Sequence, residues 1–438
     1  MKKGFYAVML AQALSSLADN ALFIAAISLI NNDLHGPEWM QGAMKWFFAF
    51  AYVILAAFVG AIADSFPKGK VMFATNTLKF FGCIMMFAYL LIPSESNTLQ
   101  AYLVCLCYGI VGIGAAAYSP AKYGIVTEML PPEDLVKGNS WIEGLTVLSI
   151  ILGFVTGGVL IEPKTAEIIR SIPFVSHLVT TPGECAVFVI AFIYVAAALC
   201  NLMIPNTHYV YPKQSRNPIT LTKKFSKFVV ALWKDPVGQL SLAVTTLFWG
   251  AGACLQLIVI KWGSDYLNYS TSDSSYLMGI SAIGIAIGAV LASLVPLKKG
   301  FMVMPCGVLM GLITPLMIHI TPDHAWEVYA LLLSVGILSG FFVVPMNALL
   351  QHRGHVLLSA GHSIAVQNFN EQLNILLMVG IYTWMLHAEL SISTIIYAFS
   401  SCVALIMLLC MIWYWHNKRK YPVAFNEIGD TAHGKAQI

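Results

Sequence analysis

Asp19 and Asn20 place a carboxylate and an amide side by side inside an otherwise apolar stretch, "SSLADNALFIAAISLI" at residues 15–30. A carboxylate in such surroundings suits two kinds of chemistry: attraction of a cationic group on a ligand, or uptake and release of a proton. The alternative is a packing role, with the carboxylate protonated or hydrogen-bonded to Asn20 and a neighbouring helix. We expect a ligand-binding role, because the equivalent stretch later in the chain has the uncharged pair Trp249 and Gly250.

Lys79 and Lys122 supply the opposite charge in apolar surroundings. Lys79 lies about eight residues into its apolar run, too deep to reach the membrane surface easily. An ion pair with a carboxylate and a contact with substrate are equally good interpretations of this lysine. Lys122 lies in "SPAKYG", where we expect Gly124 to end the helix. Phosphate contact and interaction with the helix C-terminal dipole both remain open for Lys122.

A polar stripe lies on one predicted helix within residues 362–386. "AVQNFNEQLN" places Gln367, Asn370, Glu371 and Asn374 at positions i, i+3, i+4 and i+7, which share one helix face. A polar stripe in a membrane must face protein or water. Interhelical hydrogen bonds, worth about 0.6 kcal/mol each, are one interpretation. We favour a hydrated cavity or gate, because the stripe includes a carboxylate.

The composition indicates the elements that position these residues. Of 438 residues, 58% are hydrophobic and 10% are charged, against about 25% charged in an ordinary soluble domain. Runs of about 18 or more apolar residues are long enough to span a bilayer. About twelve such runs occur, near residues 7–31, 44–63, 71–93, 100–120, 139–161, 186–205, 237–262, 274–295, 301–320, 327–350, 362–386 and 393–415. The sequence therefore predicts an all-α polytopic membrane protein.

Basic residues are concentrated in the loops that share a side with both termini. These are Lys2, Lys3, Lys68, Lys70, Lys137, Lys298, Lys299, Arg353, Lys418, Arg419 and Lys420, with Lys213, Arg216, Lys223, Lys224, Lys227 and Lys234 in the 206–236 connection. The opposite loops hold only Lys164 and Arg170. The positive-inside rule therefore places both termini in the cytoplasm. The net charge of +3 reflects this topology and indicates no nucleic-acid partner.

The two halves of the chain carry matching residues at a nearly constant offset of about 228 positions, which is typical of duplicated transporter halves. The matched pairs are Gly60 and Gly288, Pro120 and Pro345, and Glu143 and Glu371. We expect Glu143 to act as a gate or as the partner of Lys79 or Lys122. The predicted organisation is a six-helix half at 1–205, a cytoplasmic linker at 206–236 with a basic amphipathic helix at the membrane surface, a second half at 237–416, and a disordered cytoplasmic tail at 417–438.

Several motifs together resemble the bacterial lysophospholipid transporters of the major facilitator superfamily. They are "DNALF", "GAIADSFPKGKVM", "GIGAAAYSPAKYGI", "LFWGAG", "GFFVVPMNALLQ" and "AVQN", between about residues 7 and 415. The resemblance implies the twelve-helix major facilitator fold. It also implies facilitated movement of lysophospholipids, chiefly the ethanolamine form, from the periplasmic to the cytoplasmic leaflet of the inner membrane. A cytoplasmic acyltransferase/acyl-carrier-protein synthetase would then restore the missing acyl chain.

The resemblance also assigns roles to individual residues. Gln256 stands where the family's pattern has an arginine, so Lys79, Lys122 or hydrogen bonds would have to hold the phosphate. Gly60, Asp64, Lys68 and Lys70 form the gating loop "GAIADSFPKGK". There we expect Gly60 to permit close helix approach and Asp64 to accept hydrogen bonds from a facing helix N-terminus. We expect both lysines to remain in cytoplasmic water.

Two rival functions remain open. A proton-driven exporter of small amphiphiles would share the fold, with Asp19 or Glu371 as its proton carrier. A membrane-embedded acyltransferase is the alternative from a different class, but none of the eleven histidines lies in a recognisable catalytic pattern. The nine cysteines occur singly in apolar segments and suggest neither disulfides nor a metal site. We predict no cofactor.

Overall fold

The computed structural model describes residues 3–93, 96–130, 135–208, 217–321, 324–358, 360–426 and 428. These residues form helices and their connections, with no strand among them, which confirms the all-α prediction. The chain divides into two compact units. Unit 1 comprises residues 1–216, 269–279 and 379–387, and unit 2 comprises residues 217–268, 280–378 and 388–438.

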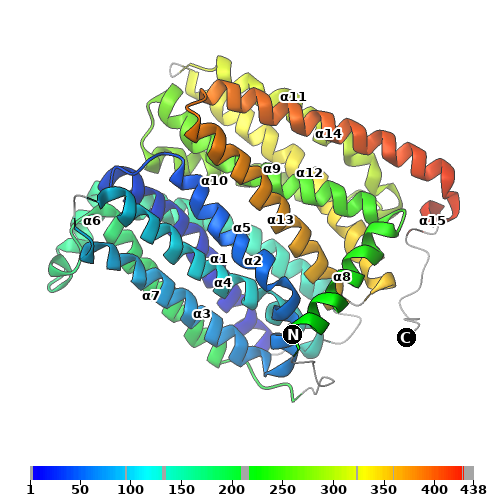
Figure 1. Ribbon diagram of the computed structural model, residues 1–438, viewed down its shortest axis with the longest axis horizontal. Coiled ribbons are helices and arrows are strands. Elements are labelled where there is room, and N and C mark those ends of the chain that lie inside the picture. The colour runs from blue at the N-terminus through cyan, green and yellow to red at the C-terminus, as the bar shows by residue number, and fades with distance from the viewer. Residues whose placement is uncertain are drawn as a thin grey trace. The chain divides into compact units, whose positions relative to one another are not determined.

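The helices of unit 1 pack around α1. They are α1 (Lys3–Ser28), η1 (Leu29–Asp33), α2 (Met40–Ser65), α3 (Lys68–Met85), η2 (Met86–Leu91), α4 (Asn97–Met129), α5 (Leu135–Leu160), α6 (Pro163–Arg170), η5 (Val175–His177) and α7 (Pro182–Leu202). α1 packs against α5 and α7, while α3 packs against α4 and lies beside α7 (Figure 1). This arrangement surrounds the polar residues of α1 with side chains from α3, α5 and α7.

Local sequence determines where α6 and α7 begin. Pro163 opens α6, which bends away from α5 by 73° after a short break. Pro182 opens α7, and Thr181 and Glu184 form a capping box in which each side chain satisfies the other's backbone N–H. The N-termini of α6 and α7 therefore fix the conformation of the segment that connects α5 to α7.

Unit 2 contains the linker helix and most of the later helices. Their bounds are α8 (Pro218–Lys234), α9 (Gly238–Leu267), α10 (Thr271–Ala292), η6 (Leu297–Val303), α11 (Met304–Ile313), η7 (Thr314–His319), α12 (Ala325–Leu357), α13 (Ala360–His387), α14 (Ile392–Lys420) and α15 (Pro422–Asn426). The first turns of α10 and the last of α13 belong to unit 1. α9 packs against α12 and α14, and α11 also packs against α12 and α14.

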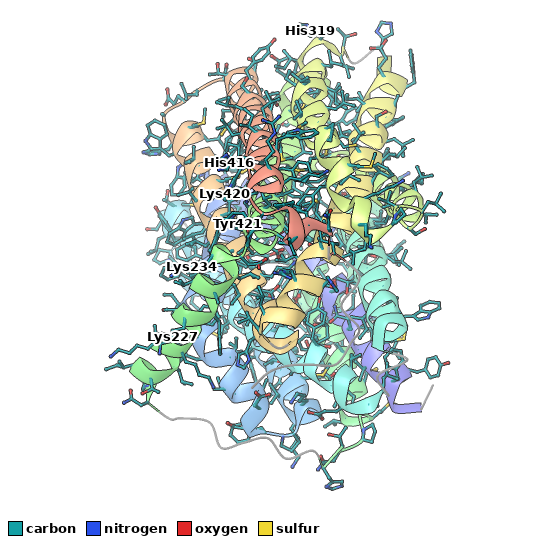
Figure 2. The ribbon with its side chains drawn as sticks, turned by 90° about the vertical axis from the view of Figure 1, so that its right-hand side faces the viewer. Lys227, Lys234, His319, His416, Lys420 and Tyr421 are labelled. Atoms are coloured by element: carbon teal, nitrogen blue, oxygen red, sulfur yellow. The ribbon has the colours of Figure 1, made fainter. Side chains whose placement is uncertain are left out.

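The predicted amphipathic linker helix is present as α8. Its apolar face packs into unit 2, where Leu232 is fully buried against Leu242, Leu350 and Val366. Its lysines remain exposed, with Lys227 and Lys234 at different heights along the helix (Figure 2). α8 therefore has an apolar side that rests on its own unit and a basic side that is free to face solvent or lipid head groups.

The first residues of the predicted disordered tail are helical. Residues 417–420 complete α14, whose end carries His416 and Lys420 (Figure 2). α15 follows, and its Phe425 packs against Phe301 and Tyr414 with ring centroids 5.7 and 5.8 Å away. This aromatic contact explains why the polar-looking segment is helical. From residue 429 onward the tail lies outside the described residues.

Among the described residues, ten helices are long and apolar enough to cross a membrane, or eleven if α5 and α6 count as one bent span. The twelve predicted runs also include 362–386, which forms α13. Its polar stripe makes α13 less apolar than the other spans. The protein is thus a multi-pass membrane protein, as predicted.

Candidate functional site

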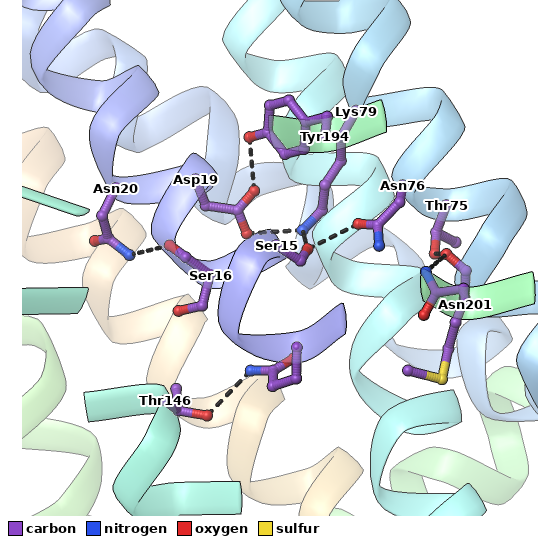
Figure 3. Close-up of polar contacts among 12 residues, drawn as sticks. Ser15, Ser16, Asp19, Asn20, Thr75, Asn76, Lys79, Thr146, Tyr194 and Asn201 are labelled. Carbon is purple, nitrogen blue, oxygen red and sulfur yellow. Dashed lines mark hydrogen bonds and ion pairs between the residues drawn. The ribbon is translucent and has the colours of Figure 1, made fainter. Parts of the chain in front are cut away.

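Asp19 and Lys79 form an ion pair in the interior of unit 1 (Figure 3). Lys79 Nζ lies 2.7 Å from Asp19 Oδ2 and donates a further hydrogen bond of 2.9 Å to Ser15 Oγ. Tyr194 donates its hydroxyl to Asp19 Oδ1 at 2.8 Å, and Ser15 donates to Asn76 Oδ1 at 2.7 Å. We call these five residues, from α1, α3 and α7, the ion-pair cluster.

The two ions differ in their access to solvent. The side chain of Lys79 is 2% exposed, whereas that of Asp19 is 19% exposed. Removing one member of a buried pair costs about 3–5 kcal/mol, because the remaining charge is left without a partner. Lys79 therefore needs an anion close by, and Asp19 is the member of the pair that an incoming ligand can reach.

Helix periodicity explains the shape of the cluster. Ser15 and Asp19 are four residues apart on α1, and Asn76 and Lys79 are three apart on α3, so each pair shares a helix face. Asn20 points elsewhere: its amide donates 2.8 Å to the Ser16 carbonyl oxygen on the same helix. The structure brings Asp19 and Lys79 together, and among the described residues no hydrogen bond joins Asn20 to either of them.

Lys122 lies elsewhere on α4, and the predicted helix end at Gly124 is wrong. α4 continues through Gly124 to Met129. Lys122 is 6% exposed, with its Nζ 4.2 Å from the ring centroid of Tyr123. Gly124 instead makes room for a neighbour, because a Cβ at this position would lie 2.2 Å from Lys68 Cε.

Two expectations for the gating loop need correction. Lys68 does not remain in water: its side chain is 3% exposed, and its Nζ lies 2.8 Å from Glu128 Oε1 and 3.5 Å from Asp64 Oδ1. Burial beside Gly124 and pairing with Glu128 explain the difference. No described residue approaches Gly60 closely, since none has an atom within 4 Å of a Cβ built there. Lys70 is exposed, as expected.

The polar stripe of α13 is largely buried within unit 2. Gln367, Asn370 and Glu371 are each at most 7% exposed, and Gln367 donates 2.7 Å to Glu371 Oε1. Trp233 of α8 donates to Asn370 Oδ1 at 3.0 Å, and Asn374 donates to the Thr246 carbonyl oxygen at 2.9 Å. The hydrogen bonds of Asn370 and Asn374 are interhelical, as in the alternative to a hydrated cavity, whereas the bond between Gln367 and Glu371 lies within α13.

The remaining candidates lie outside the ion-pair cluster. Gln256 is half-buried on α9 in unit 2. Glu143 belongs to α5, but its side chain lies outside the described residues, so neither of its expected roles is addressed. Lys79 has Asp19 as its carboxylate partner. No group of three or more metal-ligating side chains occurs among the described residues.

Sequence reasoning missed four polar residues that the structure ties to these sites. Ser15 accepts a hydrogen bond from Lys79 and donates one to Asn76. Tyr194 donates a hydrogen bond to Asp19, and Glu128 forms an ion pair with Lys68. Helical spacing from Asp19 and Lys79 points to Ser15 and Asn76. Tyr194 and Glu128 come from different helices, so only tertiary packing brings them to their partners.

The sequence of this chain is similar to those of known proteins. The family model "Major Facilitator Superfamily" matches residues 8–377. The lysophospholipid transporter LplT of Enterobacter sp. (strain 638) is 37% identical over 420 residues, covering 95% of this chain and 97% of that protein. LplT of Escherichia coli (strain SE11) is 38% identical over 418 residues, covering 95% and 96%.

Two solved structures have a similar fold. A bacterial homologue of the human lysosomal transporter Spinster, in an inward-facing and unoccupied conformation, has a TM-score of 0.66 at 13% identity, covering 97% of this chain and 99% of that chain. A bacterial homologue of the iron transporter ferroportin, in an outward-facing state, has a TM-score of 0.64 at 11% identity, covering 95% and 100%. These likenesses concern the fold alone.

Proposed function

This chain belongs to the lysophospholipid transporter family of the major facilitator superfamily, and we propose that it moves lysophospholipids between the leaflets of a bacterial inner membrane. The preferred substrate is lysophosphatidylethanolamine, and the direction is from the periplasmic to the cytoplasmic leaflet. Members of the superfamily are transporters, not enzymes. The observation that carries the proposal is the Asp19–Lys79 ion pair in the interior of unit 1.

The ion-pair cluster matches the charges of an ethanolamine phosphate head group. Such a head group carries an ammonium and a phosphate, the same two charges that Lys79 and Asp19 present to each other. The ammonium first approaches Asp19, the more exposed partner, and replaces Lys79 there. Lys79 then turns to the phosphate, which accepts hydrogen bonds from it.

This exchange leaves no ion unpaired at its start or at its end. The cost of separating the protein's own pair is offset by two new pairs with the substrate. No proton has to be taken up or released to keep the charges balanced. The mechanism therefore corresponds to facilitated diffusion, in which the gradient of the lipid itself drives movement.

The basic loops support the orientation and the destination. By the positive-inside rule they favour a topology with both termini and α8 in the cytoplasm and the α6 region in the periplasm. Lysophospholipid delivered to the cytoplasmic leaflet becomes accessible to a cytoplasmic acyltransferase/acyl-carrier-protein synthetase. That enzyme would complete the repair by restoring the second chain.

We further propose that the lipid reaches the cluster sideways from the bilayer. Drawing a chain of roughly sixteen carbons out of hydrocarbon into water costs on the order of 12 kcal/mol, at about 0.8 kcal/mol per CH₂. A route that hydrates only the head group avoids this barrier. The stripe from Gln367 to Asn374 would supply polar contacts along that route once its internal hydrogen bonds exchange.

The alternative route is an enclosed central cavity that shelters the whole molecule. Cysteine pairs that crosslink α5 to α10 and α2 to α13 distinguish the two routes. Lateral access predicts that closing both seams stops flipping of lysophosphatidylethanolamine, and that reduction restores it. Unchanged flipping with both seams closed supports the enclosed cavity.

Leaflet-resolved flipping in proteoliposomes tests the function itself. Labelled lysophosphatidylethanolamine is placed in one leaflet, and its appearance in the other is followed with and without a proton gradient. We expect flipping that depends on the protein and proceeds at the same rate in both conditions. Flipping that stops when the gradient is removed would support the proton-driven exporter instead, and no flipping above protein-free vesicles would refute lysophospholipid transport.

A further inference from the structure

A cavity lies in unit 1 between the end of α6 and the segment that leads to α7. Its volume is about 380 Å³, and its walls are Glu167, Arg170, Ser171, Ser176, Val179 and Thr180. These residues come from the last turns of α6 and the segment that leads to α7. Since α1 starts at the opposite end of the unit, the cavity is far from the N-terminus along the helix axes, as Figure 1 shows for α6.

The cavity presents one charge of each sign together with hydroxyl groups. Glu167 and Arg170 are three residues apart on α6, yet no ion pair joins them among the described residues. Arg170 uses Nη1 to donate 3.0 Å to the Thr180 carbonyl oxygen and Nε to donate 3.4 Å to that of Ala166. Its Nη2 has no acceptor in the described part of the chain. Both charges are thus available to a ligand that carries one of each.

The floor of the cavity is held in place before any ligand arrives. Glu184, which is 1% exposed, accepts hydrogen bonds from the backbone N–H of Thr180 at 2.6 Å and from its hydroxyl at 2.9 Å. Tyr89 donates to the other oxygen of Glu184 at 2.5 Å. Because Thr180 in turn holds Arg170, the guanidinium is positioned by a buried network and not by a mobile loop.

Large apolar side chains surround this polar cavity. Ile168, Ile172 and Phe174 are 68%, 51% and 72% exposed. Phe174 has φ of 76°, a region that costs an aromatic residue about 1–3 kcal/mol, so the fold keeps this ring outward against local strain. The 73° bend after α5 turns α6 across the helix axes, which is the orientation of a helix that lies in a membrane interface.

We propose that this cavity is an interfacial docking site for the zwitterionic head group of a single-chain phospholipid. The inference rests on the proposed function and adds a second binding place to it, on the periplasmic side. Arg170 and the Ser176 hydroxyl hold the phosphate, Glu167 holds the ammonium, and Ile168, Ile172 and Phe174 rest in the acyl region. The site concentrates substrate in the outer leaflet before it reaches the ion-pair cluster.

Transport kinetics test this role in full-length protein in proteoliposomes. Arg170→Gln and Glu167→Gln should each raise the KM for lysophosphatidylethanolamine about fivefold and leave kcat unchanged, since one exposed charge-assisted contact is lost. Lys164→Gln is the matched control, because it removes an exposed charge from α6 outside the cavity. With lysophosphatidylglycerol, which lacks the ammonium, only Arg170→Gln should raise KM. An unchanged KM in both cavity variants, or an equal effect of Lys164→Gln, would overturn the docking site.

A binding measurement separates this inference from the proposed function. A photoreactive amino acid at Phe174 is crosslinked to radiolabelled lysophosphatidylethanolamine, which requires no transport. We expect labelling that Arg170→Gln reduces severalfold, that unlabelled lysolipid competes away, and that soluble glycerophosphoethanolamine at equal concentration does not. Labelling in a protein that fails to flip lipid would refute the function and retain the site. Labelling insensitive to Arg170→Gln and Glu167→Gln, or equal competition by the soluble head group, would refute the lipid site.

Discussion

The polar clusters on α1 and on α13 use different chemistry. In unit 1 a full ion pair, Asp19 with Lys79, joins α1 to α3. In unit 2 the polar stripe of α13 consists mostly of amides, and the carboxylate of Glu371 accepts from Gln367 of the same helix. Amide hydrogen bonds suit helix packing, whereas a buried ion pair is a costly way to pack helices. The contrast supports a division in which the ion-pair cluster of unit 1 recognises charge and the stripe of α13 supplies a largely neutral polar surface. An ion pair of unit 2, Arg353 with Asp235, lies elsewhere and joins α12 to the end of α8.

The two matched glycines, Gly60 and Gly288, also differ in how closely they are packed. Gly288 on α10 contacts α12 so closely that a Cβ would lie 2.0 Å from the Ile337 carbonyl oxygen. Gly60 on α2, its repeat counterpart, has no atom of a described residue within 4 Å of that position. One repeat position is therefore a packing site in unit 2 and an open surface in unit 1.

The largest expected effect comes from the ion-pair cluster. Asp19→Asn should abolish flipping of lysophosphatidylethanolamine while the protein still inserts, because the ammonium loses its partner. It should also destabilise unit 1 by about 3–5 kcal/mol, since Lys79 remains buried without a counter-ion. The double variant Asp19→Asn, Lys79→Gln should recover thermal stability but not flipping. Wild-type flipping by Asp19→Asn would eliminate it as a head-group ligand.

The glycine pair gives the next largest effect, on stability. Gly288→Ala should destabilise the protein by about 1–3 kcal/mol or more, because α10 and α12 would have to separate. Gly60→Ala should be neutral or stabilise by up to about 1 kcal/mol, through helix propensity. Thermal unfolding of both variants in the same detergent checks the contrast. Similar losses in the two variants would show that the difference in packing is not real.

A smaller effect is expected at the gating loop. Asp64→Ala should slow turnover several-fold and change substrate affinity little, because Asp64 touches Lys68 and no substrate. The loss is partial because Lys68 keeps its closer partner, Glu128. Initial rates at varied lipid concentration separate kcat from KM. A normal kcat with weakened binding would contradict the gating role.

The smallest effect is expected in the polar stripe of unit 2. Glu371→Gln preserves side-chain shape and can still accept a hydrogen bond from Gln367. Flipping should therefore fall by no more than about threefold, in line with a neutral interhelical network. Complete loss of flipping in Glu371→Gln, alongside wild-type flipping that depends on a proton gradient, would instead identify Glu371 as a proton carrier.

Much of this molecule could be read from the sequence, for identifiable physical reasons. Long apolar runs predict spanning helices, and helical spacing joins the stripe residues of α13. Asp19 and Lys79 each lie deep within an apolar run, where a charge is costly to bury, so the sequence alone marks them as candidate site residues. Burial of Lys68 was not predictable, because it depends on Gly124 and Glu128 of another helix. Likewise, nothing local to Tyr194 indicates that its hydroxyl meets Asp19.

Affinity for two head groups tests the central claim most directly. Binding of lysophosphatidylethanolamine and of lysophosphatidylglycerol is measured to wild-type protein and to Asp19→Asn, which avoids any dependence on transport. If Asp19 meets the ammonium, the variant should bind the ethanolamine lipid about tenfold or more weakly, as expected for a lost hydrogen bond between charged groups. Its affinity for the glycerol lipid, which has no ammonium, should stay the same or rise. An equal loss for both lipids, or no loss for the ethanolamine lipid, would contradict the account.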